Sequence, residues 1–110
     1  MPSPPKFKLI WSEKNRDAVR ALGKKAIHRG LKKEFLDSIE FIIEKLSEEP
    51  LGWGDPLYSY KAMDLSLCHG IYFLLHIYYA VDENKQIVYV QELLPIPGLG
   101  LDDPGRDPAA

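Results

Sequence analysis

The feature that most limits how this chain can fold is an apolar run of eleven residues, Ile71–Val81, interrupted only by His76. A helix that crosses a membrane needs about 20 apolar residues, so the run is roughly half a span. Its alternating positions are apolar on both faces, which is typical of a central strand that is covered on both sides. The run therefore predicts a buried strand in the middle of a sheet.

The residues that follow predict a partner for this strand. Asp82–Lys85 is polar and is expected to form a four-residue hairpin loop. Gln86–Leu94 then returns as a strand, which Pro95 ends because proline cannot donate to a ladder. The alternation places the following side chains on one face: Val88, Val90, Glu92 and Leu94.

Two amphipathic helices are predicted before the sheet. Ser12 is an N-cap for a helix over 13–28, and Gly30 is a natural stop for it. A second helix over 31–48 has apolar residues at helical spacing and ends before Pro50. The short connection between the two helices predicts a helical hairpin.

The remaining elements are short. Phe7–Trp11 predicts a strand, and Leu51–Pro56 predicts a loop because it is rich in Gly and Pro. Further short strands are predicted over Leu57–Lys61 and Leu65–Cys68, and Gly70 is expected to mark a turn or a bulge.

The order strand, helix, helix and then antiparallel strands defines an α+β fold. The first strand is expected to insert in the later sheet, and the helical hairpin is expected to pack on one face of a four- to five-stranded sheet. A chain of 110 residues is sufficient for one domain, which we place at 1–98. The Gly-, Pro- and Asp-rich residues 99–110 are expected to form a disordered tail.

Composition excludes several kinds of protein. Apolar residues make up 45% of the chain, which argues against disorder throughout. Cys68 is the only cysteine, so no internal disulfide is possible, and neither a metal site nor a cofactor is predicted. The first six residues have no apolar run after them, so we predict no signal peptide, no membrane association and a reducing cytoplasm.

Charge is distributed unevenly along the sequence. Lys14–Lys33 carries eight basic residues and one acid, Asp17, whereas 34–110 carries four basic and fourteen acidic residues. We predict a partner-binding surface on the helical hairpin formed by Arg16, Arg20, Lys24, Lys25, Arg29, Lys32 and Lys33. Such a surface suits nucleic-acid phosphates or an acidic protein segment, and it is also compatible with an ordinary solvated face.

Three segments carry a family resemblance: Gly70-Ile71-Tyr72-Phe73, Tyr79-Ala80-Val81-Asp82-Glu83 and Ile87-Val88-Tyr89-Val90. Together with the opening Phe7–Ser12, they make about residues 6–98 resemble the RelE/ParE superfamily of toxins from bacterial type II toxin–antitoxin pairs. The resemblance implies the fold predicted above and a cognate antitoxin that binds by folding an extended or helical segment across the toxin. It also implies growth inhibition and plasmid stabilisation as biological roles.

The chain departs from the ribonuclease branch of that family, which cuts messenger RNA on the ribosome. Phe73 stands where an arginine usually follows the tyrosine, and no arginine occurs between Arg29 and Arg106. Arginine suits phosphate because its planar fork binds in a bidentate way. If the chain is nevertheless an endoribonuclease, the candidate catalytic residues are Lys61, His69 and Tyr72.

The departures favour a ParE-like protein that acts by binding an antitoxin and, by resemblance, a target such as DNA gyrase. Two alternatives stay open: a ribosome-dependent mRNA endoribonuclease, and an inactive member kept as a binding module. Simpler interpretations also exist for single residues. His69 is compatible with an exposed turn, and Lys61 with a solvated strand edge. His76 is compatible with a half-buried position that has one hydrogen-bond partner, and Cys68 with a small buried residue.

Overall fold

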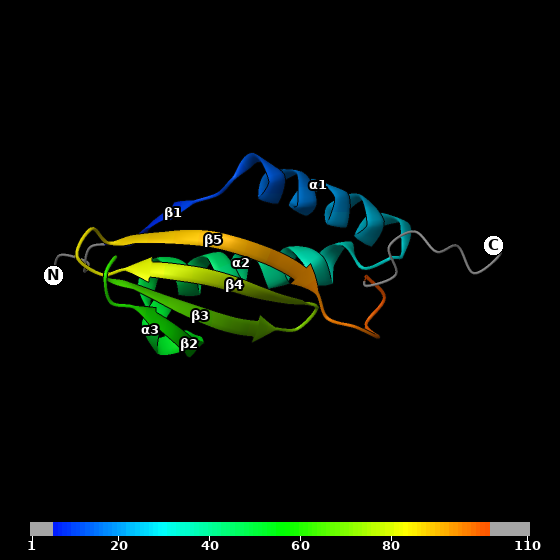
Figure 1. The fold of residues 1–110 in the computed structure, drawn as a ribbon. Coiled ribbons are helices and arrows are strands. Elements are labelled where there is room, and N and C mark those ends of the chain that lie inside the picture. The colour runs from blue at the N-terminus through cyan, green and yellow to red at the C-terminus, as the bar shows by residue number, and fades with distance from the viewer. Residues whose placement is uncertain (1–5, 102–110) are drawn as a thin grey trace, which may run out of the picture.

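The computed structural model describes residues 6–101 and has the predicted α+β architecture (Figure 1). Its elements are β1 (Lys8–Ile10), α1 (Glu13–His28), α2 (Lys32–Glu48), α3 (Pro50–Trp53), β2 (Asp55–Tyr60), β3 (Leu65–Tyr72), β4 (Leu75–Asp82) and β5 (Ile87–Pro95). The described strands form one sheet in the order β1-β5-β4-β3-β2. β1 runs parallel to β5, and all other neighbours are antiparallel, so the sheet is mixed.

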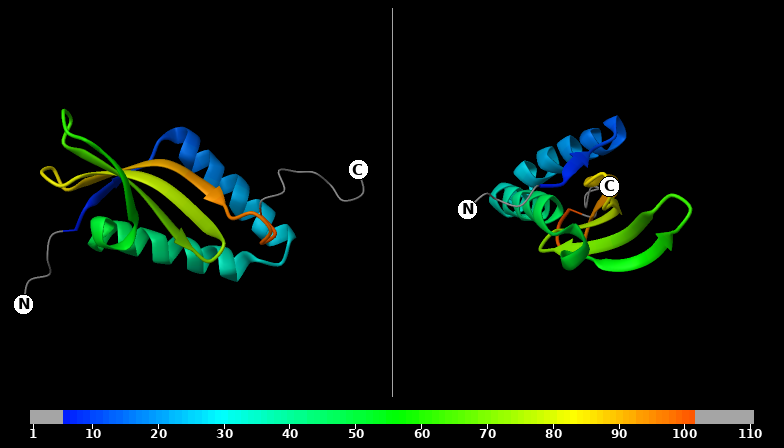
Figure 2. Two further views of the ribbon diagram at one scale, coloured as in Figure 1. Left: turned by 60° about the horizontal axis from the view of Figure 1, so that its bottom comes forward. Right: turned by 90° about the vertical axis from the view of Figure 1, so that its left-hand side faces the viewer.

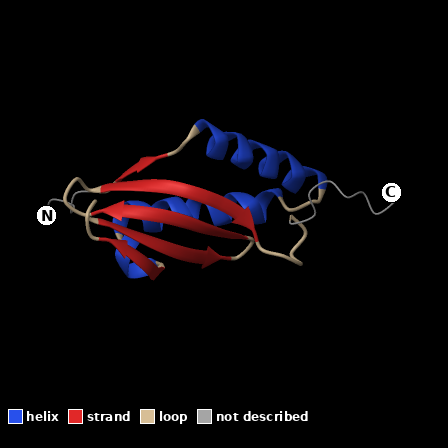
Figure 3. Cartoon of the chain, in the orientation of Figure 1, coloured by secondary structure: helices blue, strands red, loops and turns tan. Residues whose placement is uncertain are grey.

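The two long helices lie on one side of the curved sheet, and no helix among the described residues covers its other side (Figures 2 and 3). α2 supplies Phe35, Ile42 and Leu46 to the core, where they meet the inward side chains of β4 and β5. α1 runs beside β5 and α2. None of the described helices is long and apolar enough to cross a membrane. The predicted packing of a helical hairpin on one sheet face is confirmed.

The single strand predicted over Ile71–Val81 is wrong, because the chain turns within it. β3 runs through Gly70 to Tyr72, a tight turn follows at Phe73 and Leu74, and β4 begins at Leu75. Phe73 adopts a left-handed backbone with φ 54°, a conformation that bulky residues rarely take. No Gly, Asn or Asp marks this turn, so the sequence contains no local signal for it.

The expected turn or bulge at Gly70 is likewise absent, because Gly70 lies inside β3 and is buried. A Cβ at this position would lie 2.3 Å from the six-membered ring of Trp53. The missing side chain therefore makes room for Trp53. Glycine is needed here for close packing and not because the chain turns.

The loop predicted over Leu51–Pro56 is also corrected. Pro50 starts the one-turn helix α3, where its missing N–H removes no hydrogen bond, and β2 already begins at Asp55. The hydroxyl of Tyr79 donates to the carbonyl of Pro50 at 2.5 Å, and the Trp53 ring stacks on Tyr79. These contacts fix α3 against the sheet core.

The predicted alternation along the last strand fails halfway. β4 residue Tyr78 pairs with Glu92 but its neighbour Tyr79 pairs with Val90, so Gln91 is an extra residue in a β-bulge. The bulge exposes Glu92 and turns Leu93 into the core beside Val90. The preceding turn spans 83–86, one residue later than predicted, and has Gln86 at φ 54°.

The folded core continues past position 98, where the sequence alone places the end of the domain. Leu101 is 1% exposed and belongs to the hydrophobic core. The rest of the predicted tail, 102–110, lies outside the described residues.

Candidate functional site

A groove between α1 and α2 is the first candidate site and lies on the helical side of the molecule. Its volume is about 320 Å³, and it is lined by Trp11, Arg16, Val19, Arg20, Ile39 and Ile43. The floor is apolar and the α1 wall carries two guanidinium groups. We call this feature the hairpin groove.

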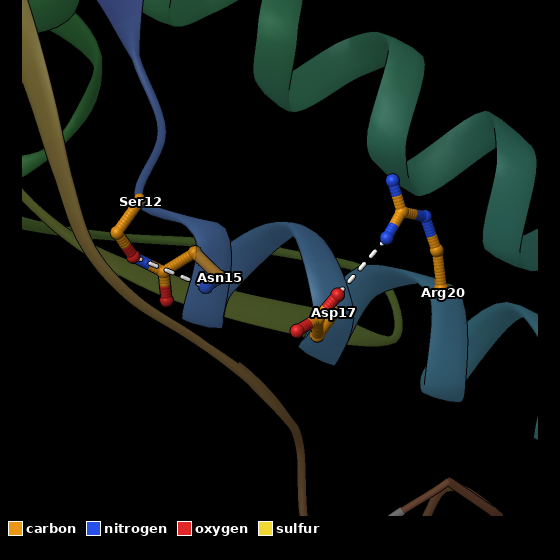
Figure 4. Close-up of polar contacts among 4 residues, drawn as sticks. All are labelled: Ser12, Asn15, Asp17 and Arg20. Carbon is orange, nitrogen blue, oxygen red and sulfur yellow. Dashed lines mark hydrogen bonds and ion pairs between the residues drawn. The ribbon is translucent and has the colours of Figure 1, made fainter.

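Local sequence positions the α1 wall of the hairpin groove. The Ser12 hydroxyl accepts a hydrogen bond from the Asn15 N–H at 3.1 Å and caps α1, as predicted (Figure 4). From this start, Arg16 and Arg20 are four residues apart and share one helix face. Figure 4 shows Arg20 directed from α1 toward α2, with its guanidinium 2.9 Å from the Asp17 carboxylate.

The ion pair between Arg20 and Asp17 on this wall is weak. Their side chains are 71% and 63% exposed, so water screens the attraction, which is typically worth less than about 1 kcal/mol. Arg20 can exchange this contact for a partner's carboxylate at small cost.

Exposed apolar side chains extend the hairpin groove along both helices. Ile43 is 38% exposed and Leu36 is 46% exposed on α2, while Ile27 is 60% exposed on α1. Ile27 is eleven residues after Arg16, which is close to three helical turns, so the two share a face. Because the helices are joined by the short turn at Gly30, Ile27 and Leu36 lie toward the turn end of the groove.

The seven predicted partner-binding residues do not form one patch. Arg16 and Arg20 line the hairpin groove. Lys25 is nine residues from Arg16, which is about 180° around the helix, and it lines a separate apolar pocket with Leu22. Lys24 is exposed, and three more basic residues gather around the turn between the helices: Arg29, Lys32 and Lys33.

Lys32 and Lys33 occupy an unfavourable place. They begin α2, whose N-cap Leu31 makes no side-chain hydrogen bond, and the positive end of a helix repels cations. The first turn of α2 also carries one acid, Glu34, which offsets only part of this charge. This local conflict concentrates positive charge where an anionic partner would relieve it.

The open face of the sheet is the second candidate site. A concave region of about 550 Å³ lies on it, lined by Tyr60, Met63, Leu65, Leu67, Tyr78, Ala80, Gln91 and Glu92. β2 to β5 contain no lysine or arginine. The charged side chain in this lining is an acid, so the face is poorly suited to a phosphate backbone.

The structure does not bring Lys61, His69 and Tyr72 together. Lys61 is exposed in the turn after β2, while His69 lies four residues beyond the hairpin end at Leu65, about 13 Å along the strand. Tyr72 is three residues from His69 and therefore points to the opposite face, where it stacks on Phe41 of α2 with ring centroids 3.7 Å apart.

A pair that the sequence did not predict does form on the open face. The His69 Nε2 and the His76 Nδ1 are 2.9 Å apart, and the His69 ring lies against Tyr78 at 4.5 Å. Burial lowers the pKa of His76, the neighbouring His69 lowers it further, and Glu92 partly opposes this. His76 is thus half-buried with one hydrogen-bond partner, as expected, but that partner is a candidate site residue.

Comparisons with known proteins identify the fold. Neither the known protein-family models nor the curated protein sequences give a match to this chain. Among solved structures, a chain in the crystal structure of the toxin–antitoxin complex RelBE2 from Mycobacterium tuberculosis matches with a TM-score of 0.61 and 17% identity. The match covers 87% of this chain and 98% of that one, so the RelE/ParE-like fold predicted from the sequence is confirmed.

Proposed function

We propose that this chain is the toxin-family component of a bacterial type II toxin–antitoxin pair and that it acts by binding proteins. The observation that carries the proposal is the hairpin groove, whose apolar floor is bordered by Arg16 and Arg20. The likeness to a chain of a toxin–antitoxin complex supports it at the level of the fold.

The proposed occupant of the hairpin groove is an amphipathic, acidic segment of the antitoxin. Apolar side chains at helical spacing would fill the space over Val19, Ile39 and Ile43. Carboxylates at its margin would pair with Arg16 and Arg20, and bidentate pairing is the geometry that arginine favours. The lysines at the start of α2 would attract the same acidic segment during its approach.

Two observations weigh against the ribonuclease alternative. The open face has no lysine or arginine on β2 to β5, and Tyr72 packs against α2 instead of facing His69. A ParE-like mode of action, with DNA gyrase as the target, needs no such residues and is the finer form of the proposal. The inactive binding module differs from it only in lacking a target.

The test starts from the reading frame beside this one, which is expected to encode a short acidic protein. The two full-length proteins are co-expressed and purified. Isothermal titration calorimetry then measures the affinity between them. Arg16→Glu/Arg20→Glu should weaken their binding strongly, because it reverses the charge of the groove wall. The matched control Lys61→Glu/Lys85→Glu makes the same charge change on exposed turns beside the sheet and should bind as the parent does.

Equal weakening by both double variants would show general charge attraction and contradict the groove assignment. The mode of action is tested separately on growth and on enzymes. Inhibition of gyrase supercoiling by the purified chain is expected, and unchanged supercoiling with excess protein would contradict the ParE-like form. Growth arrest that Lys61→Ala/His69→Ala relieves would support the ribonuclease instead, and no arrest on induction would support the inactive module.

A further inference from the structure

The histidine pair on the open sheet face is a feature that the proposed protein-binding role leaves unused. His69 on β3 and His76 on β4 come from strands that pair directly, with His69 opposite Tyr78 and His76 opposite Ile71. This register puts both imidazoles on the same face, two residues apart along the ladder. Both are partly exposed, so an ion in solution can reach them.

We propose that His69 Nε2 and His76 Nδ1 form a bidentate site for a divalent transition-metal ion of the Ni²⁺ or Cu²⁺ class. The two nitrogens are 2.9 Å apart. Two ligands of one ion lie about 2.9–3.3 Å apart at metal–nitrogen bonds of about 2.0–2.1 Å, so the two rings are close enough to share an ion once they turn. Imidazole ligands suit Cu²⁺ and Ni²⁺, and the affinity order of the divalent metals peaks at Cu²⁺.

Binding requires a modest turn of the two rings. Their centroids are 5.1 Å apart and their planes are 82° apart, so the nitrogens now point at one another and share one proton. Each ring must rotate until both lone pairs meet at the metal instead. The partial exposure of both side chains leaves room for this rotation. The proton of the hydrogen bond moves through solvent to the ring nitrogen that does not bind the metal, so both imidazoles stay neutral.

The charged groups around the pair are two carboxylates and one lysine, since Lys25 of α1 lines a pocket together with His76. Asp55 lies opposite His69 in the β2–β3 register, and Glu92 lies opposite Tyr78 in the β4–β5 register, so both carboxylates are on the open face. No three His, Cys, Asp or Glu side chains converge anywhere in residues 6–101. The protein thus supplies two nitrogen ligands, water fills the other positions, and the nearby acids add long-range attraction.

Metal and proton compete for the same imidazole nitrogens, because a metal needs the neutral ring. Metal binding should therefore weaken as the pH falls and the imidazoles take up protons.

The experiment titrates the untagged full-length chain with Ni²⁺, Cu²⁺ or Zn²⁺ by calorimetry in a buffer that does not bind metals. One equivalent should bind, with Zn²⁺ weaker than Cu²⁺. His69→Asn and His76→Asn should each weaken binding by at least about tenfold, a loss typical even when a partner outside the ligand shell is removed. His28→Asn changes the third histidine, exposed on α1, and should have no effect.

Binding that survives both strand variants, or that His28→Asn abolishes, would overturn the site. Tighter binding of Zn²⁺ than of Cu²⁺ would contradict a site built from two imidazoles. A second measurement uses only the parent chain, so it does not depend on how well a variant folds. Cu²⁺ is added, and the paramagnetic broadening of the amide NMR signals is recorded. Broadened amide signals should centre on residues 68–70 and 75–77, and broadening centred on α1 would contradict the proposal.

Discussion

The side-chain amide of Asn15 in α1 donates a hydrogen bond to the carbonyl of Val90 in β5 at 3.0 Å, and it also reaches the carbonyl of Gln91 at 3.2 Å. These carbonyls flank the β-bulge and lie beyond Ile10, the last residue of β1, which pairs with β5 only as far as Tyr89. α1 thereby covers the part of the β5 edge that β1 leaves unpaired. Asn15 is the contact that joins the helical hairpin to the irregular point of the sheet.

Asn15→Ala should destabilise the fold by about 1–3 kcal/mol, the range for leaving a buried polar group without its partner. Asn15 is 5% exposed, so water replaces its amide poorly. Chemical denaturation followed by circular dichroism measures the change. Lys14→Ala, on the exposed neighbouring residue, is the control and should stay within about 0.5 kcal/mol of the parent. Equal stability of the two variants would contradict the role assigned to Asn15.

Gly70→Ala should also destabilise, by about 1–3 kcal/mol, because overpacking displaces a well-packed ring. The added methyl group would meet Trp53 at 2.3 Å. Gly52→Ala is the matched control, since its nearest neighbouring atom would be 3.7 Å away. Thermal melts of both variants, with Trp fluorescence as a second reading, test this. A Gly70→Ala melt that coincides with the control would show that the ring moves freely.

Phe73→Asn should raise the melting temperature, by the equivalent of about 1 kcal/mol, because asparagine tolerates the left-handed conformation better than a bulky residue does. Phe73 is 50% exposed, so half of its burial is lost, which reduces the gain without cancelling it. Ile71→Asn makes a similar change at a position that is 59% exposed on extended backbone, and it should not stabilise. Stabilisation by both substitutions would indicate a general effect of surface polarity instead.

Stability should fall as the solution is acidified through the range just below pH 6.5, in part because of His76. Burial lowers the pKa of His76 in the folded state, so the unfolded chain, with a pKa of about 6.5, takes up its proton first. The contribution of His76 to stability is complete above about pH 6.5. It is lost as the pH falls from there through the lower pKa of the folded state. The groups facing His76 are His69, which adds to the effect, and Glu92, which opposes it. Lys25 of α1 also lines a pocket with His76.

His76→Asn should flatten this decline, which melting temperatures of both proteins between pH 7.5 and pH 5 would show. The difference between the two curves isolates the histidine, because the carboxylates are common to both proteins. His28→Asn should preserve the slope of the parent. Parallel curves for His76→Asn and the parent would contradict a lowered pKa of His76 in the folded state.

Sequence patterning alone determined the α+β class, the bounds of α1, the Ser12 cap and the uneven charge of the chain. These follow from local chemistry: helical spacing of apolar residues, a capping hydroxyl and the positions of Lys and Arg. The resemblance to the RelE/ParE superfamily added the fold, which the structural match confirms. Each of these inferences needed only neighbouring residues or a familiar order of elements.

Tertiary structure alone decided how the strands turn and pair. Ile71–Val81 has no turn residue, so the reversal at Phe73 depends on the pairing of β3 with β4 and on the core that both strands bury. That reversal is what brings His69 beside His76, seven residues apart in the sequence and 2.9 Å apart in space. The bulge at Gln91 likewise lies where Asn15, 76 residues away, donates a hydrogen bond to β5. Such contacts depend on distant segments, and no local pattern encodes them.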